Sequence, residues 1–376
     1  MIKRLIEKQI VSKFYKGKAI ILLGPRQSGK STLIESILNK RKEKILRLNG
    51  DDSDTRTLLS ETNSSKLKNI TSGYKIVFID EAQRITNIGL TIKIIVDKIK
   101  DVQLIATGSS AFELTAKINE PLTGRKYVFM LYPLSFQEMC DEHGLLEEKR
   151  QIEQRLIYGS FPEIVTKPDE SKELLKTMAE SYLYKDLLLL EQINKPVLLE
   201  KIVKALALQV GGEVKYHEVG QIVNADPMTV EKYIDLLEKA YVLFRLPALN
   251  RNVRNEIKKG KKIYFFDNGI RNAVIGNYNS LTSRNDIGAL WENYLISERV
   301  KWLSYNKTDV SKYFWRTALQ QEIDYIEELN NTFDIFEFKW SKSARAKFSK
   351  SFTGNYTVKE KRLVNFDNVE EFLLQN

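Results

Sequence analysis

Short apolar runs alternate with helix-like segments over the first part of the chain. Between the first two runs, "KSTLIESILNK" spaces Leu33, Ile34, Ile37 and Leu38 as one face of a helix. The runs typical of buried strands cover residues 18–24, 43–52, 74–80, 102–108 and 125–136. Strands that alternate with helices predict an α/β fold with a mostly parallel, covered sheet. Ligands of such a sheet bind at the C-terminal ends of its strands.

The pattern changes beyond residue 165 to helices followed by a hairpin. Residues 173–191 and 195–212 have helical periodicity, and Asp226-Pro227 is a typical start for a further helix. The runs "YVLFRLPAL" and "KKIYFFD" predict two strands joined by a basic loop. Helix, turn, helix and hairpin predict a winged helix. We therefore expect a first domain over 1–165 and a helical and winged-helix domain over 166–265.

The remaining residues, 266–376, are expected to form a third, α/β domain. The segment "DIGALWENYLISERV" is an amphipathic helix that contains Glu292. It is followed by "EIDYIEEL" and "TFDIFEFKW", which predict strands. Because strand side chains alternate, Glu322 and Asp324 share one face of their strand. Glu337 and Lys339 likewise share a face of the next strand.

Composition narrows the classes of protein. The 376 residues include one cysteine and two histidines, which excludes an internal disulfide and makes a zinc cluster not credible. There is no apolar run long enough to cross a membrane, and the N-terminus lacks the apolar core of a secretory signal. These features predict a cytoplasmic protein without a membrane partner.

The segment "GPRQSGKST" lies at the first predicted strand-to-helix turn. It matches the phosphate-binding pattern G-x-x-x-x-G-K-[ST], because glycines permit close phosphate approach and a helix N-terminus favours an anion. Lys30 would contact the β- and γ-phosphates, and the Ser31 hydroxyl would face Mg²⁺. The residues expected to surround the nucleotide are Gly24, Pro25, Arg26, Gln27, Ser28, Gly29, Lys30, Ser31 and Thr32.

Polar residues also end two later strands. Asp80 and Glu81 follow the apolar run "KIVFI", and adjacent carboxylates repel each other unless a cation is present. Asp80 is expected to hold the Mg²⁺ water shell, and Glu81 to orient and polarise the attacking water. Thr107 or Ser109, after the next run, could sense the γ-phosphate; ordinary turn caps are the alternative.

These motifs together resemble the AAA-type ATPases of bacteria and archaea. The resemblance rests on "GPRQSGKST", "VFIDEAQRI", "ATGSSAFEL" and "PLTGRKYVFMLYPLSFQE" and covers roughly the first 165 residues. It implies a P-loop NTPase sheet and ATP hydrolysis by Lys30, Ser31, Asp80 and Glu81. It also points to Arg125 as an arginine finger, acting within its own subunit or in a neighbour. The alternative for Arg125 is a surface ion pair.

The order of acidic residues in the third domain is similar to the PD-(D/E)-x-K nuclease-like core. That resemblance implies that Asp324 and Glu337, assisted by Glu292, hold Mg²⁺ and that Lys339 places or activates water. No proline precedes Asp324, and Ile323 stands where a polar neighbour is usual. A carboxylate–lysine salt bridge is the other interpretation. The same C-terminal arrangement accompanies the ATPase family as a domain of unknown function.

Positive charge is concentrated in two segments of a chain whose net charge is +10. Residues 249–262 carry six basic residues and one acidic residue, and residues 339–362 carry eight and one. They predict contact with DNA phosphates or, alternatively, solvated loops. The helix after Asp226 exposes more acids than lysines, so it is a poor reader of bases. A protein partner for a degenerate C-terminal half is the second hypothesis, and an oligomer is compatible with either.

Overall fold

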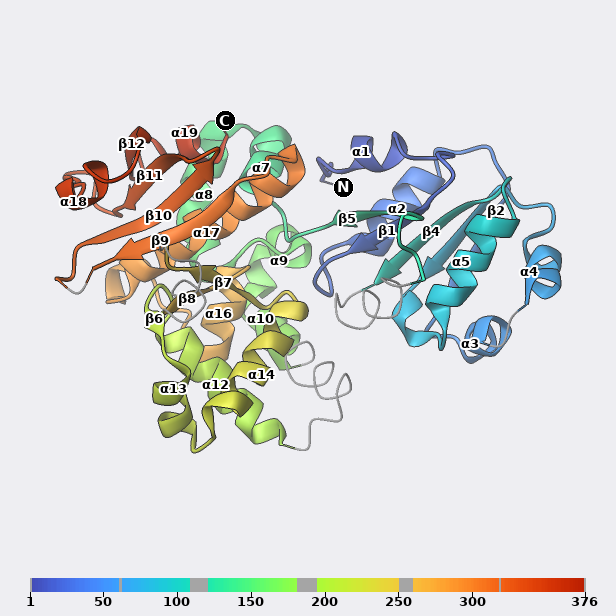
Figure 1. The fold of residues 1–376 in the computed structure, drawn as a ribbon, viewed down its shortest axis with the longest axis horizontal. Coiled ribbons are helices and arrows are strands. Elements are labelled where there is room, and N and C mark those ends of the chain that lie inside the picture. Colours follow the sequence, from blue (N-terminus) through green and yellow to red (C-terminus); the bar gives the residue numbers. More distant parts are fainter. Residues whose placement is uncertain are drawn as a thin grey trace. The chain divides into compact units, whose positions relative to one another are not determined.

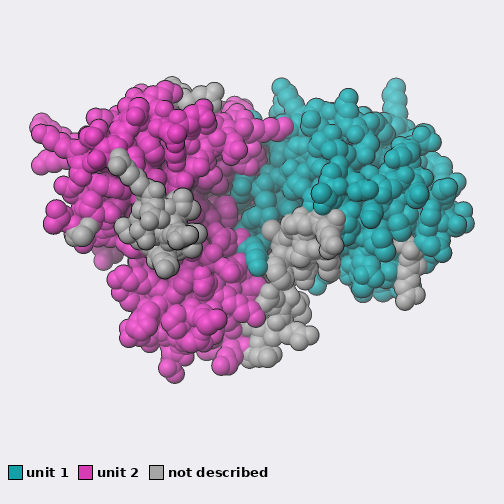
Figure 2. All heavy atoms as spheres, in the orientation of Figure 1, with its two compact units in different colours: residues 1–134, 239–241 teal, residues 135–238, 242–376 magenta. Residues whose placement is uncertain are grey.

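The computed structural model describes residues 2–60, 63–108, 121–180, 195–249, 260–317 and 319–374. The chain divides into two compact units, residues 1–134 with 239–241 and residues 135–238 with 242–376 (Figure 2). Residues 135–165, which the sequence analysis placed with the first domain, therefore pack in the second unit. The reason is a set of buried contacts within that unit. The Phe136 amide donates to Glu298 at 2.7 Å, and the Ser160 amide donates to Asp267 at 2.7 Å.

Unit 1 is built on a five-stranded parallel sheet in the order β2-β3-β4-β1-β5, flanked by helices (Figure 1). Its strands are β1 Ala19–Leu23, β2 Ile45–Asn49, β3 Ile76–Asp80, β4 Gln103–Gly108 and β5 Lys126–Met130. Its helices are α1 Glu7–Val11, α2 Lys30–Leu38, α3 Ser53–Ser60, α4 Ser64–Thr71 and α5 Ile88–Lys98. The five apolar runs thus form the five strands, which confirms the expected parallel sheet.

The central strands of this sheet are apolar on both faces because helices cover both. Every residue of β1 is buried. Alternate residues of β1 pack with Ile88, Ile92 and Ile95 of α5 in one apolar cluster. Burying such continuous apolar runs is the main stabilisation of a parallel sheet. The sheet consequently holds its strand ends, and the loops that follow them, in fixed positions.

Unit 2 begins with helices and continues with two sheets. Its helices are α7 Phe136–His143, α8 Leu145–Tyr158, α9 Pro162–Thr166, α10 Ser171–Met178, α12 Pro196–Leu208, α13 Tyr216–Val223, α14 Pro227–Lys239, α16 Asn268–Ile275, α17 Ile287–Asn306, α18 Lys350–Thr353 and α19 Val369–Leu373. Its strands are β6 Glu213–Val214, β7 Leu243–Pro247, β8 Lys261–Phe265, β9 Ser311–Arg316, β10 Glu322–Leu329, β11 Thr332–Phe338 and β12 Val358–Val364.

The first sheet of unit 2 is antiparallel, in the order β6-β8-β7. Along the chain β6 lies between α12 and α13, and β7 and β8 follow α14. Asp226 caps α14 as expected, because its side chain accepts from the Thr229 amide at 2.9 Å. Of the helix expected over 173–191, the structure describes residues 173–180, and α10 covers them as far as Met178. Most of the basic loop of the hairpin, residues 250–259, lies outside the described residues.

The second sheet of unit 2 has the order β12-β11-β10-β9. Strands β9, β10 and β11 run antiparallel, whereas β12 runs parallel to β11. The two sheets meet where the Leu249 amide donates to the Phe314 carbonyl at 2.7 Å, beside β7 and β9. The long helix α17 packs against β8 and β11. Unit 2 therefore joins its helical part and its mixed sheet in one body (Figure 1).

Candidate functional site

The loop between β1 and α2 has backbone conformations that demand its glycines. Gly24 has φ of 151°, and a Cβ there would lie 2.0 Å from the Leu131 carbonyl oxygen. Gly29 caps α2 with φ of 91°, in the left-handed region. Gln27 also adopts positive φ, at 61°. The chain is thus folded tightly at the C-terminal end of β1, where the first amides of α2 are available to an anion.

Lys30 is buried beneath this loop. Its Nζ donates to the carbonyl oxygens of Gly24 at 3.0 Å and Pro25 at 2.8 Å. Burial lowers its pKa to about 8, and the opposing charges of Glu81 and Asp80 only partly compensate. Phosphate oxygens can replace both carbonyl contacts, and their negative charge would raise the pKa of Lys30 so that the side chain is fully protonated. The lysine therefore sits in an environment that favours an incoming anion.

Two further groups support this interpretation of the loop. The Ser28 hydroxyl is buried and has no hydrogen-bond partner in the described part of the chain. Arg4, a residue that sequence reasoning missed, is buried and donates to the carbonyl oxygens of Ser28 at 2.8 Å and Tyr132 at 2.6 Å. Arg4 thus ties the loop to the segment after β5. The sequence gives no signal for this role, because Arg4 is one of several charges spread along the N-terminal stretch.

Asp80 and Glu81 lie at the end of β3, and Thr107, the predicted sensor, lies on β4, between β3 and β1. Strand β4 pairs with both β1 and β3, so Thr107 lies opposite Leu22 near the start of the loop. The Thr107 hydroxyl donates to Asp80, and the Glu81 amide lies 3.3 Å from the same hydroxyl. The structure therefore brings Asp80 and Thr107 together at this end of the sheet. The role of Thr107 as a sensor of the γ-phosphate stays a prediction. Ser109, its alternative, lies outside the described residues.

Glu81 has a strained backbone at the tip of β3. Its φ of 47° is in the left-handed region, which residues other than glycine rarely occupy. Its carboxylate accepts a hydrogen bond from the side chain of Gln83, which is itself buried. Strained residues of this kind cluster at functional sites, where the surrounding structure holds them.

Arg125 lies at the other edge of the sheet. Its carbonyl accepts from the amide of Ala19, the first residue of β1, whereas the phosphate loop follows the last residue. Five strand residues span about 16 Å at ~3.3 Å each. The Arg125 Nε donates to Asp97 at 2.7 Å. Within its own subunit Arg125 is thus an ion-paired residue remote from the loop, which agrees with the alternative of a surface ion pair. A role as an arginine finger in a neighbouring copy stays a prediction.

The acidic residues of unit 2 also come together, but with lysines between them. Asp324 on β10 lies 3.7 Å from Nζ of Lys339, and Glu337 on β11 lies 3.4 Å from it. Glu292 on α17 lies 2.9 Å from Nζ of Lys262 on β8. Burial, and then the charge of Asp324, raises the pKa of Glu337 to about 7. Burial also raises the pKa of Glu292.

This arrangement differs from the expected magnesium site. Among the described residues, no group of three or more His, Cys, Asp or Glu side chains is arranged to hold a metal ion. Lys262, which the sequence analysis assigned to phosphate contacts on the hairpin, is instead 2% exposed and ion-paired. Lys262 lies on the same strand face as buried Tyr264, but Ile263 and Phe265 on the other face are buried too. The alternation along β8 therefore gave no local signal for its position.

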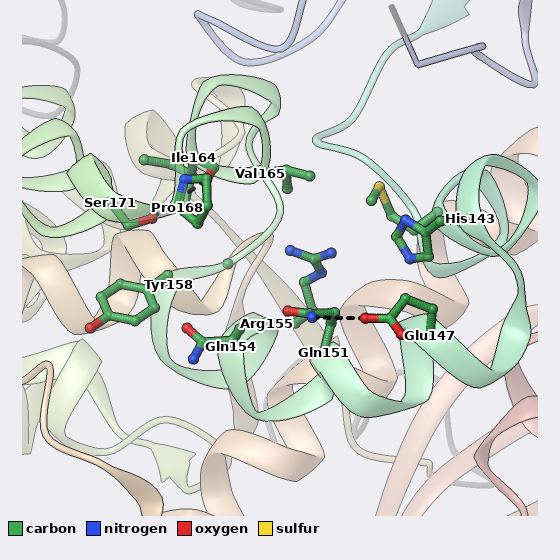
Figure 3. A pocket seen from close by; sticks show the side chains of 12 residues that line it. His143, Glu147, Gln151, Gln154, Arg155, Tyr158, Ile164, Val165, Pro168 and Ser171 are labelled. Atoms are coloured by element: carbon green, nitrogen blue, oxygen red, sulfur yellow. Dashed lines mark hydrogen bonds between the residues drawn. The ribbon is translucent and has the colours of Figure 1, made fainter.

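A cavity of about 280 Å³ lies elsewhere in unit 2, between α8 and the segment around α9 (Figure 3). Arg155 points into it, but this guanidinium already donates twice to Glu148, at 3.0 Å each. His143 contacts the same carboxylate at 3.0 Å. The charges of the cavity are thus balanced internally, and its volume is just below the range usual for small-molecule sites.

Comparisons with known proteins agree with this geometry. Residues 16–140 match a family model described as an AAA domain. Residues 149–281 and 287–373 match two families, each described as a domain of unknown function. No described helix combines the length and apolar composition needed to cross a membrane.

Individual relatives extend over much of the chain. An uncharacterized protein of Haemophilus influenzae is 26% identical over 282 residues, which are 68% of this chain and 69% of the relative. An uncharacterized protein of Mycobacterium tuberculosis is 24% identical over 330 residues, or 86% and 71%. Among solved structures, the chain is similar to a Walker-type ATPase of Pyrococcus abyssi, with a TM-score of 0.50 and 15% identity. That similarity covers 73% of this chain and 96% of the other.

The first unit therefore has the fold of a P-loop NTPase. Residues 16–140 match the AAA domain family, and the fold is similar to that of a Walker-type ATPase. This confirms the resemblance that its motifs indicate. The C-terminal match to a family of unknown function confirms the expected companion domain.

Proposed function

We propose that this protein binds ATP with Mg²⁺ and hydrolyses it at the C-terminal edge of the unit 1 sheet. The observation that carries the proposal is the contact between Thr107 on β4 and Asp80 at the end of β3. This contact lies at the same edge of the sheet as the glycine loop. Lys30, buried with its pKa lowered to about 8, supports it from the other side. The chemistry of these donors fits a triphosphate and its metal.

Each residue has a distinct role in this proposal. Lys30 exchanges its carbonyl partners for β- and γ-phosphate oxygens, and the loop amides bind the same phosphates. Ser31 and Asp80 would hold the Mg²⁺, which when bound would neutralise charge that develops on the phosphates. Glu81 orients and polarises the attacking water, and Thr107 holds Asp80 in place. Phosphoryl transfer requires little more of a protein than such positioning and charge stabilisation.

We further propose that the C-terminal half contacts the nucleic-acid backbone under control of the ATP state. Arg345, Lys347, Lys350, Lys359 and Lys361 are exposed, and no ion pair is recorded for them within the described ranges. Lys359 and Lys361 share one face of β12, which is an edge strand. Such a surface favours phosphate contact without base recognition.

The helices and hairpin of residues 196–265 are proposed to be a winged helix. The order α12, β6, α13, α14, β7, β8, with an antiparallel sheet β6-β8-β7, supports it. Its second helix is unsuited to base reading, because Asp235 and Glu238 of α14 are engaged by Arg245, the latter at 3.1 Å. We therefore assign this module a structural role or a contact with phosphates alone.

A protein partner is the second candidate for the C-terminal half. Exposed apolar side chains on α12, α13 and α14 favour it, namely Leu208, Ile222 and Met228, which are 64%, 68% and 81% exposed. A protein partner would cover such side chains, whereas a nucleic-acid backbone would not. Both candidates keep the ATPase site unchanged.

The test is Mg²⁺-dependent ATP hydrolysis with and without double-stranded DNA, at low and moderate salt. We expect stimulation by DNA that fades as salt rises, and loss of stimulation in a variant with alanine at Arg345, Lys347 and Lys350. Lys30→Ala serves as the control without turnover. Turnover that is indifferent to DNA at low salt would contradict the nucleic-acid proposal, and absence of turnover in the wild type would contradict the ATPase proposal.

A further inference from the structure

Lys262 occupies the centre of the acidic cluster of unit 2. It extends from β8 and is 2% exposed. Its Nζ lies 2.9 Å from Glu292 Oε1 on α17 and 2.7 Å from Glu322 Oε1 on β10. The ammonium also lies 5.4 Å from the ring centre of Phe314 on β9. One lysine thus contacts side chains from a helix and two strands.

The remaining two carboxylates of the cluster are also engaged by protein groups. Asp324 Oδ2 accepts from the Phe338 amide at 2.8 Å and lies 3.7 Å from Nζ of Lys339. Glu337 lies 3.4 Å from the same ammonium. Four carboxylates, Glu292, Glu322, Asp324 and Glu337, therefore face two lysines, Lys262 on β8 and Lys339 directly after β11. Glu322 also lies 3.7 Å from Nε of Arg316 at the end of β9.

A divalent metal and Lys262 compete for the same oxygens. Mg²⁺ requires close, octahedral oxygen ligands, and an ammonium within 3 Å of those oxygens both blocks and repels it. A lone lysine in so buried a position would be costly, but here the acids on both sides satisfy it. The Tyr264 hydroxyl, which donates to Glu292 at 2.5 Å, completes the enclosure.

We propose that Lys262 is the resident cation of this centre and takes the place that a divalent metal holds in nuclease-like cores. The centre is then a metal-free ion-pair hub that joins β8 to α17 and β10, and it does not cut phosphodiesters. The inference rests on the proposed likeness to nuclease-like cores and is independent of ATP hydrolysis.

The experiment replaces the lysine and asks whether a metal can take its place. In nucleotide-free protein, Lys262→Met should lower the Tm by about 5–10 °C, since it leaves buried carboxylates uncompensated. Millimolar Mn²⁺ should restore much of that loss, and electron paramagnetic resonance should show a bound Mn²⁺. The double variant Lys262→Met, Asp324→Asn should lose this rescue. Lys261→Met, on the adjacent and less buried position of β8, is the matched control.

The wild-type protein supplies a test that does not depend on a variant folding. Without nucleotide, the wild type and Asp324→Asn should bind Mn²⁺ equally. With Mg²⁺, the two proteins should also give the same result in a DNA-cleavage assay, so no cleavage should depend on Asp324. Mn²⁺ binding or DNA cleavage that Asp324→Asn lowers would overturn the proposal. A folded Lys262→Met protein whose Tm is unaffected by Mn²⁺ would overturn it as well.

Discussion

Unit 1 and unit 2 each place buried lysines among acids, but the partners differ in kind. Lys30 contacts backbone carbonyls, which phosphates can replace, and burial lowers its pKa to about 8. Burial also acts to lower the pKa of Lys262, but the carboxylates of Glu292 and Glu322 outweigh it and raise the pKa above the usual value. The first lysine gains from an incoming anion, whereas the second already has its anions. A buried lysine can thus serve as an anion-binding site when an incoming anion can replace its hydrogen-bond partners, as at Lys30, and not when carboxylates already neutralise it, as at Lys262.

The largest expected effect comes from removing the exchangeable lysine. Lys30→Ala should abolish ATP turnover, because the β- and γ-phosphates lose their cation, while the protein remains folded. Steady-state hydrolysis and a thermal melt measure the two effects. Lys68→Ala on the exposed face of α4 is the control, and it should leave turnover unchanged. A Lys30→Ala protein that retains wild-type turnover would remove the basis of the comparison.

Glu81→Gln tests the next step of the reaction. It should keep ATP bound but slow hydrolysis by about 10²–10⁴-fold, the usual contribution of a positioned base. Single-turnover hydrolysis, with nucleotide binding measured separately, distinguishes the two. Hydrolysis at the wild-type rate would show that Glu81 does not act on the water.

Lysines of unit 2 should differ from one another in stability rather than in ATP turnover. Lys262→Met should cost about 3–5 kcal/mol of unfolding free energy, since it strands buried charges. Lys339→Met should cost less than Lys262→Met, because the Lys339 side chain is 42% exposed and solvent screens its pairing with Asp324 and Glu337. Denaturant unfolding of both variants checks this order, and equal losses would show that Lys262 is not the central cation.

Arg125→Ala addresses the residue that the sheet places far from its own loop. In dilute, monomeric protein the variant should keep turnover within about twofold, because its partner is Asp97 and not the nucleotide. Turnover measured across a range of protein concentrations provides the check. A loss that grows with concentration would assign Arg125 to a neighbouring subunit, and a large loss in the monomer would contradict its placement.

The smallest effect is a proton exchange at Lys30. Its folded-state pKa of about 8 lies below the usual value of 10.5, and bound phosphates should raise it again. At pH 9, ATP binding should therefore take up as much as about one proton, and affinity should fall as pH rises above 8. Calorimetry in two buffers of different ionisation enthalpy measures the uptake. Its persistence in Lys30→Ala would assign the proton to another group.

Much of unit 1 could be predicted from the sequence because its signals are local. The glycine loop, the acids after β3 and the apolar strand runs each lie within a few residues, and parallel strands bring their C-terminal ends to one edge. The sequence shows that Arg125 stands at the start of a predicted strand. Only the sheet shows that this start, before β5, lies at the edge opposite to the glycine loop. Arg4 was missed because its partners, Ser28 and Tyr132, are distant in sequence.

Unit 2 was harder to predict because its chemistry depends on contacts between distant segments. The acids of α17, β10 and β11 could be ordered from the sequence, yet nothing local shows that Lys262 reaches them from β8. A basic run next to a hairpin is equally compatible with exposed phosphate contacts. The long-range packing of β7 against β9 and of β8 against α17 decides between the two.

The most direct test of the central claim is a count of bound Mn²⁺ by electron paramagnetic resonance, in wild-type protein with and without ATP. The account predicts one tightly bound Mn²⁺ that appears with ATP, is lost in Lys30→Ala and is unaffected by Asp324→Asn. A tightly bound Mn²⁺ that is present without nucleotide and disappears in Asp324→Asn would contradict it, because the acidic cluster of unit 2 would then hold a metal.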